Sequence, residues 1–127
     1  MIGDIITRLL ADTGITAQVG QRIFPVHVDQ DADLPAIMVT ITDMETNPTK
    51  TGTSTDDILE LDVTVYSKSA KKSFDVAALV RRSLDNFTGT MGSTTVQSLR
   101  FDSLNMNHFA GDEVYICGSD YTAHIKR

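Results

Sequence analysis

Apolar and polar residues alternate most regularly over residues 57–66, which predicts a β-strand. One face of this strand carries four apolar side chains: Leu59, Leu61, Val63 and Val65. The opposite face carries three polar side chains: Glu60, Asp62 and Thr64. A strand with one apolar and one polar face is typical of an antiparallel sheet that is covered on one side only.

Three further segments have a similar pattern, with less regular alternation. Residues 35–42 predict a strand that begins at Pro35, the position where a strand tolerates proline. Residues 95–105 predict a strand whose alternation changes phase after Val96. Residues 113–125 predict a last strand, with Gly118 as a candidate β-bulge. The expected buried face of that strand consists of Tyr115, Cys117, Tyr121, Ala123 and Ile125.

Helical spacing appears twice. Residues 4–12 predict a short helix with Asp4 as its N-cap and Gly14 as its C-terminal stop. Residues 70–87 predict a longer helix capped by Ser69. Its expected buried face consists of Phe74, Ala77, Val80, Leu84 and Phe87.

Three stretches predict neither a helix nor a regular strand of the sheet. Residues 15–21 predict a connector, and Arg22–Val28 predicts an extended segment because Pro25 keeps Phe24 out of helical geometry. The segment Asp43–Asp56 is longer than the ~2–5 residues usual for a hairpin loop. It is either a mobile hairpin tip or a contact segment.

The predicted order is helix, two strands, helix, two strands. We therefore expect one α+β domain spanning residues 1–127, with an α-β-β-α-β-β order. Its antiparallel four-stranded sheet would carry both helices on one face.

Composition and charge narrow the classes of function. The net charge of -6 disfavours tight binding to nucleic-acid phosphates. No apolar run approaches the ~20 residues of a membrane span, and the start of the chain is too short and polar for a signal peptide. One cysteine permits no disulfide within the chain, which favours a reducing, cytoplasm-like compartment.

No arrangement of residues predicts catalysis, a cofactor or a metal. The acidic run from Asp29 to Asp33 lacks the glycine and glutamate that a calcium loop needs at its sixth and twelfth positions. Cys117 falls on a predicted core face, opposite to His124, so a buried structural thiol is the better interpretation than a nucleophile. We expect no enzyme.

The order and spacing of five segments resemble the small tail-completion or tail-terminator proteins of tailed phages and prophages. These segments are Arg22–Pro25, Asp33–Ile37, Leu59–Ser67, the helix that starts near Ala70, and Asp120–Thr122. The resemblance implies an α+β protein that forms a ring, usually a hexamer, at the head-proximal end of the tail tube. The ring would stop tube growth and offer a surface for head attachment.

The same resemblance implies the partners and the location. The partners would be other copies of the chain, the tail-tube protein and a head–tail connector protein, with DNA only as cargo passing through the lumen. No membrane partner is implied. The protein would be assembled in the host cytoplasm and end in the virion tail.

Candidate contact residues lie in two segments, Arg22–Asp33 and Asp43–Asp56. They are Arg22, Phe24, Asp29, Asp31, Met44, Asn47, Lys50 and Thr53. Glu60 and Asp62 are candidates to face the lumen, or are simply solvated. Two alternatives stay open: a head–tail connector or neck protein, and a small binding module unrelated to phages.

Overall fold

The computed structural model of the chain describes residues 2–25, 34–46, 56–92, 94–109 and 114–126. Two short helices come first, α1 (Ile2–Ala11) and α2 (Thr13–Val19), followed by strands β1 (Ile23–Pro25), β2 (Ala36–Thr46) and β3 (Asp56–Ser67). Helix α3 (Ala70–Leu84) then leads into β4 (Gly89–Met91), β5 (Thr94–Phe109) and β6 (Val114–Lys126). No helix among these residues is long and apolar enough to cross a membrane.

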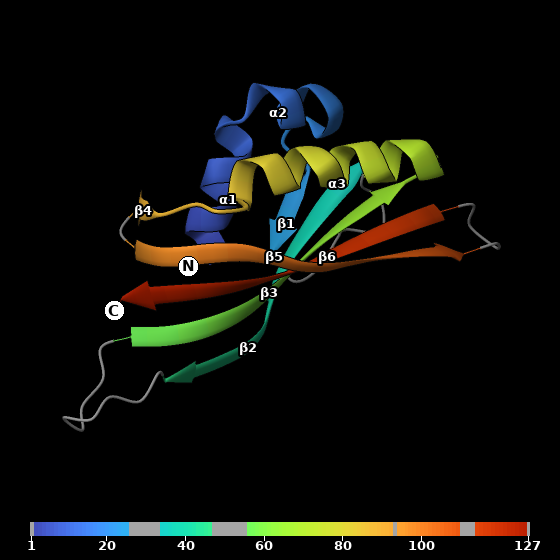
Figure 1. The fold of residues 1–127 in the computed structure, drawn as a ribbon. Coiled ribbons are helices and arrows are strands. Elements are labelled where there is room, and N and C mark those ends of the chain that lie inside the picture. The colour runs from blue at the N-terminus through green and yellow to red at the C-terminus, as the bar shows by residue number, and fades with distance from the viewer. Residues whose placement is uncertain (1, 26–33, 47–55, 93, 110–113, 127) are drawn as a thin grey trace.

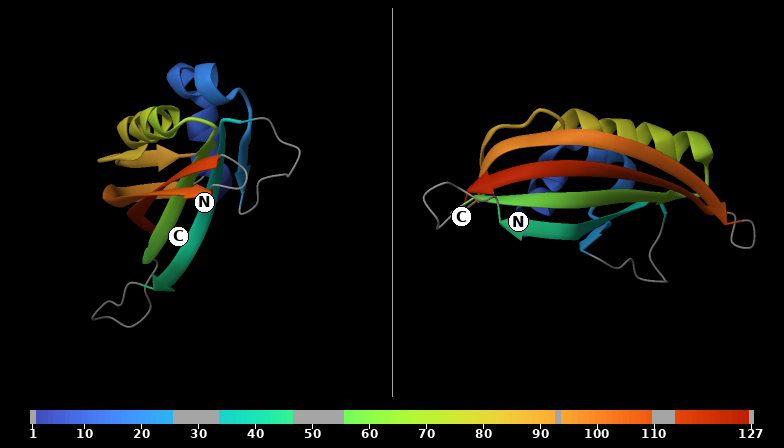
Figure 2. Two further views of the ribbon diagram at one scale, coloured as in Figure 1. Left: turned by 90° about the vertical axis from the view of Figure 1, so that its right-hand side faces the viewer. Right: turned by 60° about the horizontal axis from the view of Figure 1, so that its bottom comes forward.

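All six strands form one curled sheet in the order β1-β2-β3-β6-β5-β4. The neighbouring pairs β2–β3, β3–β6, β6–β5 and β5–β4 are antiparallel, whereas β1 pairs with β2 in parallel. The three helices lie on the same side of the sheet (Figure 1), and the other face carries no described helix. Figure 2 shows the curl of the long strands beneath the helices.

The predicted four-stranded antiparallel sheet with two helices is therefore wrong. The described residues form a mixed sheet of six strands with three helices. The two missed strands, β1 and β4, have three residues each, too few to display alternation. They exist because a longer neighbour supplies their hydrogen bonds, as when the Ile37 amide donates to the Arg22 carbonyl at 2.9 Å.

The helix ends also differ from the prediction. Residues 15–21 are no mere connector, because Asp12 caps α2 by accepting hydrogen bonds from the Gly14 and Ile15 amides. Gly14 therefore lies inside α2 and does not stop the first helix. That helix begins at Ile2, before Asp4, whose carboxylate instead accepts a hydrogen bond from Thr94 in β5 at 2.6 Å.

Helix α3 begins as predicted and ends early. The Ser69 hydroxyl caps it by accepting from the Lys72 amide. It ends at Leu84 because the next two residues bind the edge of β5 instead. The Asp85 carboxylate accepts from the Phe101 amide at 2.9 Å, and the Asn86 amide donates to the Leu99 carbonyl at 2.7 Å.

The predicted buried face of α3 is correct for Ala77, Val80 and Leu84 and wrong for Phe74, which is 50% exposed. Val76 and Ser73 are buried instead, so the covered stripe is rotated toward them. Phe87 follows the helix end and packs partly buried against the core, with the Arg8 guanidinium 4.2 Å above its ring.

Irregular register keeps the long strands aligned with one core. The register of β5 against β6 shifts between Val96 and Ser98, which confirms the predicted change of phase, and shifts again between Phe101 and Ser103. A third shift separates Ile41 from Asp43 in β2. The bulge predicted at Gly118 is wrong, since β6 pairs with β3 through that residue without a shift.

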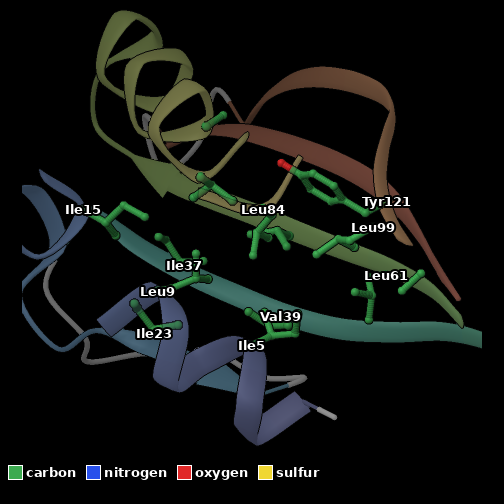
Figure 3. Packing of buried hydrophobic residues seen from close by; sticks show 14 of the residues in the cluster. Ile5, Leu9, Ile15, Ile23, Ile37, Val39, Leu61, Leu84, Leu99 and Tyr121 are labelled. Atoms are coloured by element: carbon green, nitrogen blue, oxygen red, sulfur yellow. The ribbon is translucent and has the colours of Figure 1, made fainter. Parts of the chain in front are cut away.

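A single cluster of buried apolar residues fills the space between the helices and the sheet (Figure 3). Ile5 and Leu9 come from α1, Ile15 from α2 and Leu84 from α3, and each is fully buried. The sheet contributes the alternating apolar positions that the pattern predicted in β3, which are all buried. Burial of one face of the sheet is thus the main source of stability.

Gly92 provides a test of how β4 and α1 are joined. Its φ of 60° lies in the left-handed region, and a Cβ there would overlap the Asp4 carboxylate that Thr94 binds. We expect Gly92→Ala to lower the free energy of unfolding by about 1–3 kcal/mol. The matched variant Gly3→Ala has open space in α1, so it should raise stability by about 0.5–1 kcal/mol. Urea unfolding of both variants measures the contrast, and a stabilising Gly92→Ala would contradict this packing.

Candidate assembly surfaces

The face of the sheet without described helices is polar and acidic near its centre. Asp62 of β3 lies directly opposite Asp120 of β6, and Glu60 lies opposite Thr122. Directly opposed residues of an antiparallel pair project from the same face. The sequence pattern had placed Glu60 and Asp62 on this polar face, which the structure confirms, since the alternate residues of β3 are in the core.

Hydroxyl groups surround these carboxylates. The Thr64 hydroxyl donates to Asp62, the Ser103 hydroxyl donates to Asp120 at 3.1 Å, and the Thr122 hydroxyl donates to Asp102. Glu60, Asp102 and Asp120 line a shallow hollow of about 290 Å³ between β2, β3, β5 and β6. Hydroxyl groups of the strands themselves therefore supply hydrogen bonds to these carboxylates.

Burial raises the pKa of the Asp62 carboxyl above its ordinary value, and the hydrogen bond from Thr64 opposes that rise. The neighbouring Asp120 raises the pKa of Asp62 further, because two carboxylates side by side disfavour a second negative charge. Among the described residues, no group of three or more His, Cys, Asp or Glu side chains could hold a metal ion. The arrangement is an acidic surface rather than a built metal centre.

The short hook at Arg22–Pro25 is partly engaged within the fold. Arg22 is half-buried and its Nε donates to the Pro35 carbonyl at 3.0 Å, which ties β1 to the start of β2. Phe24 is half-buried in β1, and Ile23 between them is buried. This hook is therefore part of the sheet edge, and only some of its surface is left for a neighbour.

Met44 is the most accessible of the large apolar side chains in the described part of the chain, at 61% exposed. It lies near the end of β2, between the exposed residues Asp43 and Glu45. The other candidate contact residues lie outside the described residues: Asp29, Asp31, Asn47, Lys50 and Thr53.

An apolar groove between α3 and β5 was not predicted. Phe74, Ala77, Ala78 and Arg81 line it from α3, and Phe101 and Leu104 line it from β5, around a volume of about 210 Å³. The Arg81 guanidinium lies 4.0 Å from the centre of the Phe101 ring. The sequence assigned Phe74 to the core, so the α3 wall of the groove was not recognised.

Cys117 is fully buried on the core face of β6, as predicted. Burial raises the pKa of its thiol, which keeps the thiol protonated and unreactive. His124 lies on the opposite face because β6 pairs with β3 without a bulge. A pairing of Cys117 as nucleophile with His124 as its base is therefore excluded.

Comparison with known proteins agrees with the expected resemblance. The family model described as "Tail completion protein gp17" matches residues 3–105, and no curated protein matches the chain. A chain from the structure titled "Virion of native gene transfer agent (GTA) particle" has the same fold, with a TM-score of 0.83 and 16% sequence identity. That likeness covers 100% of this chain and 95% of the other chain. The family match spans most of the sequence, so the chain belongs to the tail completion protein gp17 family, whose members are structural components of phage tails.

Proposed function

We propose that residues 1–127 act as one tail-terminator-like domain that forms a ring at the head-proximal end of the tail tube. Membership of the tail completion family carries this proposal. The ring, a hexamer, ends tube growth and provides the surface to which the head attaches. Its mechanism is geometric: each copy binds the next head to tail until the ring closes.

The acidic face of the sheet suits the lumen of such a ring. Glu60, Asp62 and Asp120 lie on one face of two neighbouring strands, and the net charge of the chain is -6. A wall of carboxylates repels the phosphates of passing DNA, so the genome slides through without binding. This placement extends the proposal to DNA as cargo rather than as a ligand.

The remaining partners are the tail-tube protein on one side of the ring and a head–tail connector protein on the other. In this proposal the contacts to these partners come from residues 26–33 and 47–55, which follow β1 and β2 in the sequence. Asp29, Asp31, Asn47, Lys50 and Thr53 belong to these two segments.

Electron microscopy tests the proposal directly. Purified protein is mixed with tail tubes from the phage or prophage that encodes it, and with its connector protein in a parallel sample. We expect a stacked ring at one end of each tube and no further tube growth when free tube subunits are added. Binding to the connector alone would favour a neck protein instead, and association with neither would contradict the proposal.

The acidic pair also predicts a cost in stability. Because the pKa of Asp62 is raised on folding, the unfolded chain loses this proton first as the pH rises, and the folded state loses stability through that range. At pH 7 we expect Asp62→Asn to raise the free energy of unfolding by about 0.2–1 kcal/mol, the usual scale for opposed like charges on a sheet.

The gain should disappear near pH 3, below the ordinary aspartate pKa of about 3.9, where Asp62 is already protonated. Glu60→Gln is the comparison variant: Glu60 lies opposite Thr122 of β6 and Asp43 of β2, but it is exposed, so water screens its repulsion more than that of Asp62. It should change stability less than Asp62→Asn at pH 7. Denaturant unfolding at both pH values measures these differences, and a destabilising Asp62→Asn at pH 7 would argue against repulsion.

A further inference from the structure

The sheet is longer than the helices that cover it. Helix α3 has 15 residues and spans roughly 22 Å, whereas β5 has 16 residues and spans roughly 53 Å when extended. The left view of Figure 2 shows the far end of β2 running away from the helices. The ends of the long strands therefore carry surface on the helix side that no described helix covers.

The three exposed large apolar side chains of the described residues are Met44, Phe74 and Met106. Met44 lies opposite Leu59, and Met106 lies opposite Cys117, so both project from the helix side of the sheet. Phe74 stands on α3 at the same side and lines the groove with Leu104 of β5. The three side chains thus share one side of the sheet but belong to its two opposite edges.

Among the described residues, both of these edges have long stretches without a strand partner. On the outer side of β5, β4 pairs only with the residues from Thr94 to Val96. Further along β5, Asn86 and Asp85, which follow α3, form hydrogen bonds with Leu99 and Phe101. Beyond Phe101, no described strand pairs with the outer edge of β5. Along β2, β1 pairs only with Ile37–Val39, so the rest of that strand has no described partner on its outer side. Open strand edges of this length readily accept another strand.

Charge also distinguishes the two edges. Met44 is flanked by Asp43 and Glu45, both exposed. The outer part of β5, from Ser103 to His108, contains no acidic residue, although Asp102 just before it is exposed. Arg81 at the groove forms an ion pair with Asp85 at 3.4 Å. An acidic edge with one protruding methionine is therefore compatible with a stretch without carboxylates beside an apolar groove, and both are on the same chain.

We propose that the open edge of β2 in one copy pairs with the open edge of β5 in the next, which inserts Met44 into the groove between α3 and β5. This inference deepens the ring of the proposed function and rests on it. Strands β2 and β5 are antiparallel within one chain, so neighbouring copies that keep the same strand direction pair antiparallel. The contact joins two different surfaces, as a closed ring requires.

Cysteine cross-linking tests the contact. The native cysteine is buried and is replaced by Cys117→Ala in every protein. One protein then carries Met44→Cys and another carries Met106→Cys, both at exposed positions that leave the core intact. They are mixed at high concentration, alone and with tail tubes, and treated with a short bismaleimide linker that tolerates a one-step shift in register.

We expect a cross-linked dimer of the mixed pair and none from either protein alone. The matched control is Thr95→Cys, which is exposed on the same strand at the stretch that β4 already covers, and it should not cross-link to Met44→Cys. A dimer of Met44→Cys with itself would overturn the proposal, because it would join two identical edges.

The outcomes also separate this contact from the proposed function. Rings on tube ends without a mixed cross-link, in solution and on tubes, would overturn the edge contact and leave the ring proposal standing. A mixed cross-link without rings on tubes would support the edge contact and contradict tail termination. Neither rings nor cross-links under both conditions would overturn both.

Discussion

Everything in this fold depends on covering one apolar face of a long, mostly antiparallel sheet. The alternate residues of β3 enter the core without exception from Asp57 to Ser67, and β6 matches them residue for residue. Helices α1, α2 and α3 cover that face, and the other face keeps its polar side chains. The hydrophobic effect thus sets which side of the sheet is inside, and every other feature follows from that assignment.

The strand irregularities serve the same constraint. A one-residue slip in a strand would move its apolar residues to the wrong face. The register shifts in β5 occur where the apolar sequence changes phase, so Val96, Leu99 and Phe101 all project toward the helices. The shift in β2 after Ile41 likewise leaves Met44 on the helix side. The bulges therefore correct the side-chain direction rather than interrupt the sheet.

The helices are shorter than the sheet that they cover, and this mismatch leaves surface of the long strands exposed. Exposed apolar side chains gather at the two open edges, while carboxylates gather on the bare face. In a monomer both features are unfavourable, since one leaves apolar surface in water and the other opposes like charges. In an assembly of copies, edge pairing and an acidic channel wall would give both features a role, which agrees with membership of a tail completion family.

The sequence by itself determined the four long strands, the long helix, the polar face with Glu60 and Asp62 and the buried Cys117, because a repeat of two or 3.6 residues is written in the local order of apolar side chains. It also carried the resemblance to the tail-completion proteins. Only the tertiary structure decided the formation of β1 and β4, because these short strands need a neighbour's hydrogen bonds. It also decided the start of α1, since Asp4 binds Thr94 instead of capping the helix. The tertiary structure also decided the exposure of Phe74, because an apolar residue is buried only where another element is long enough to reach it.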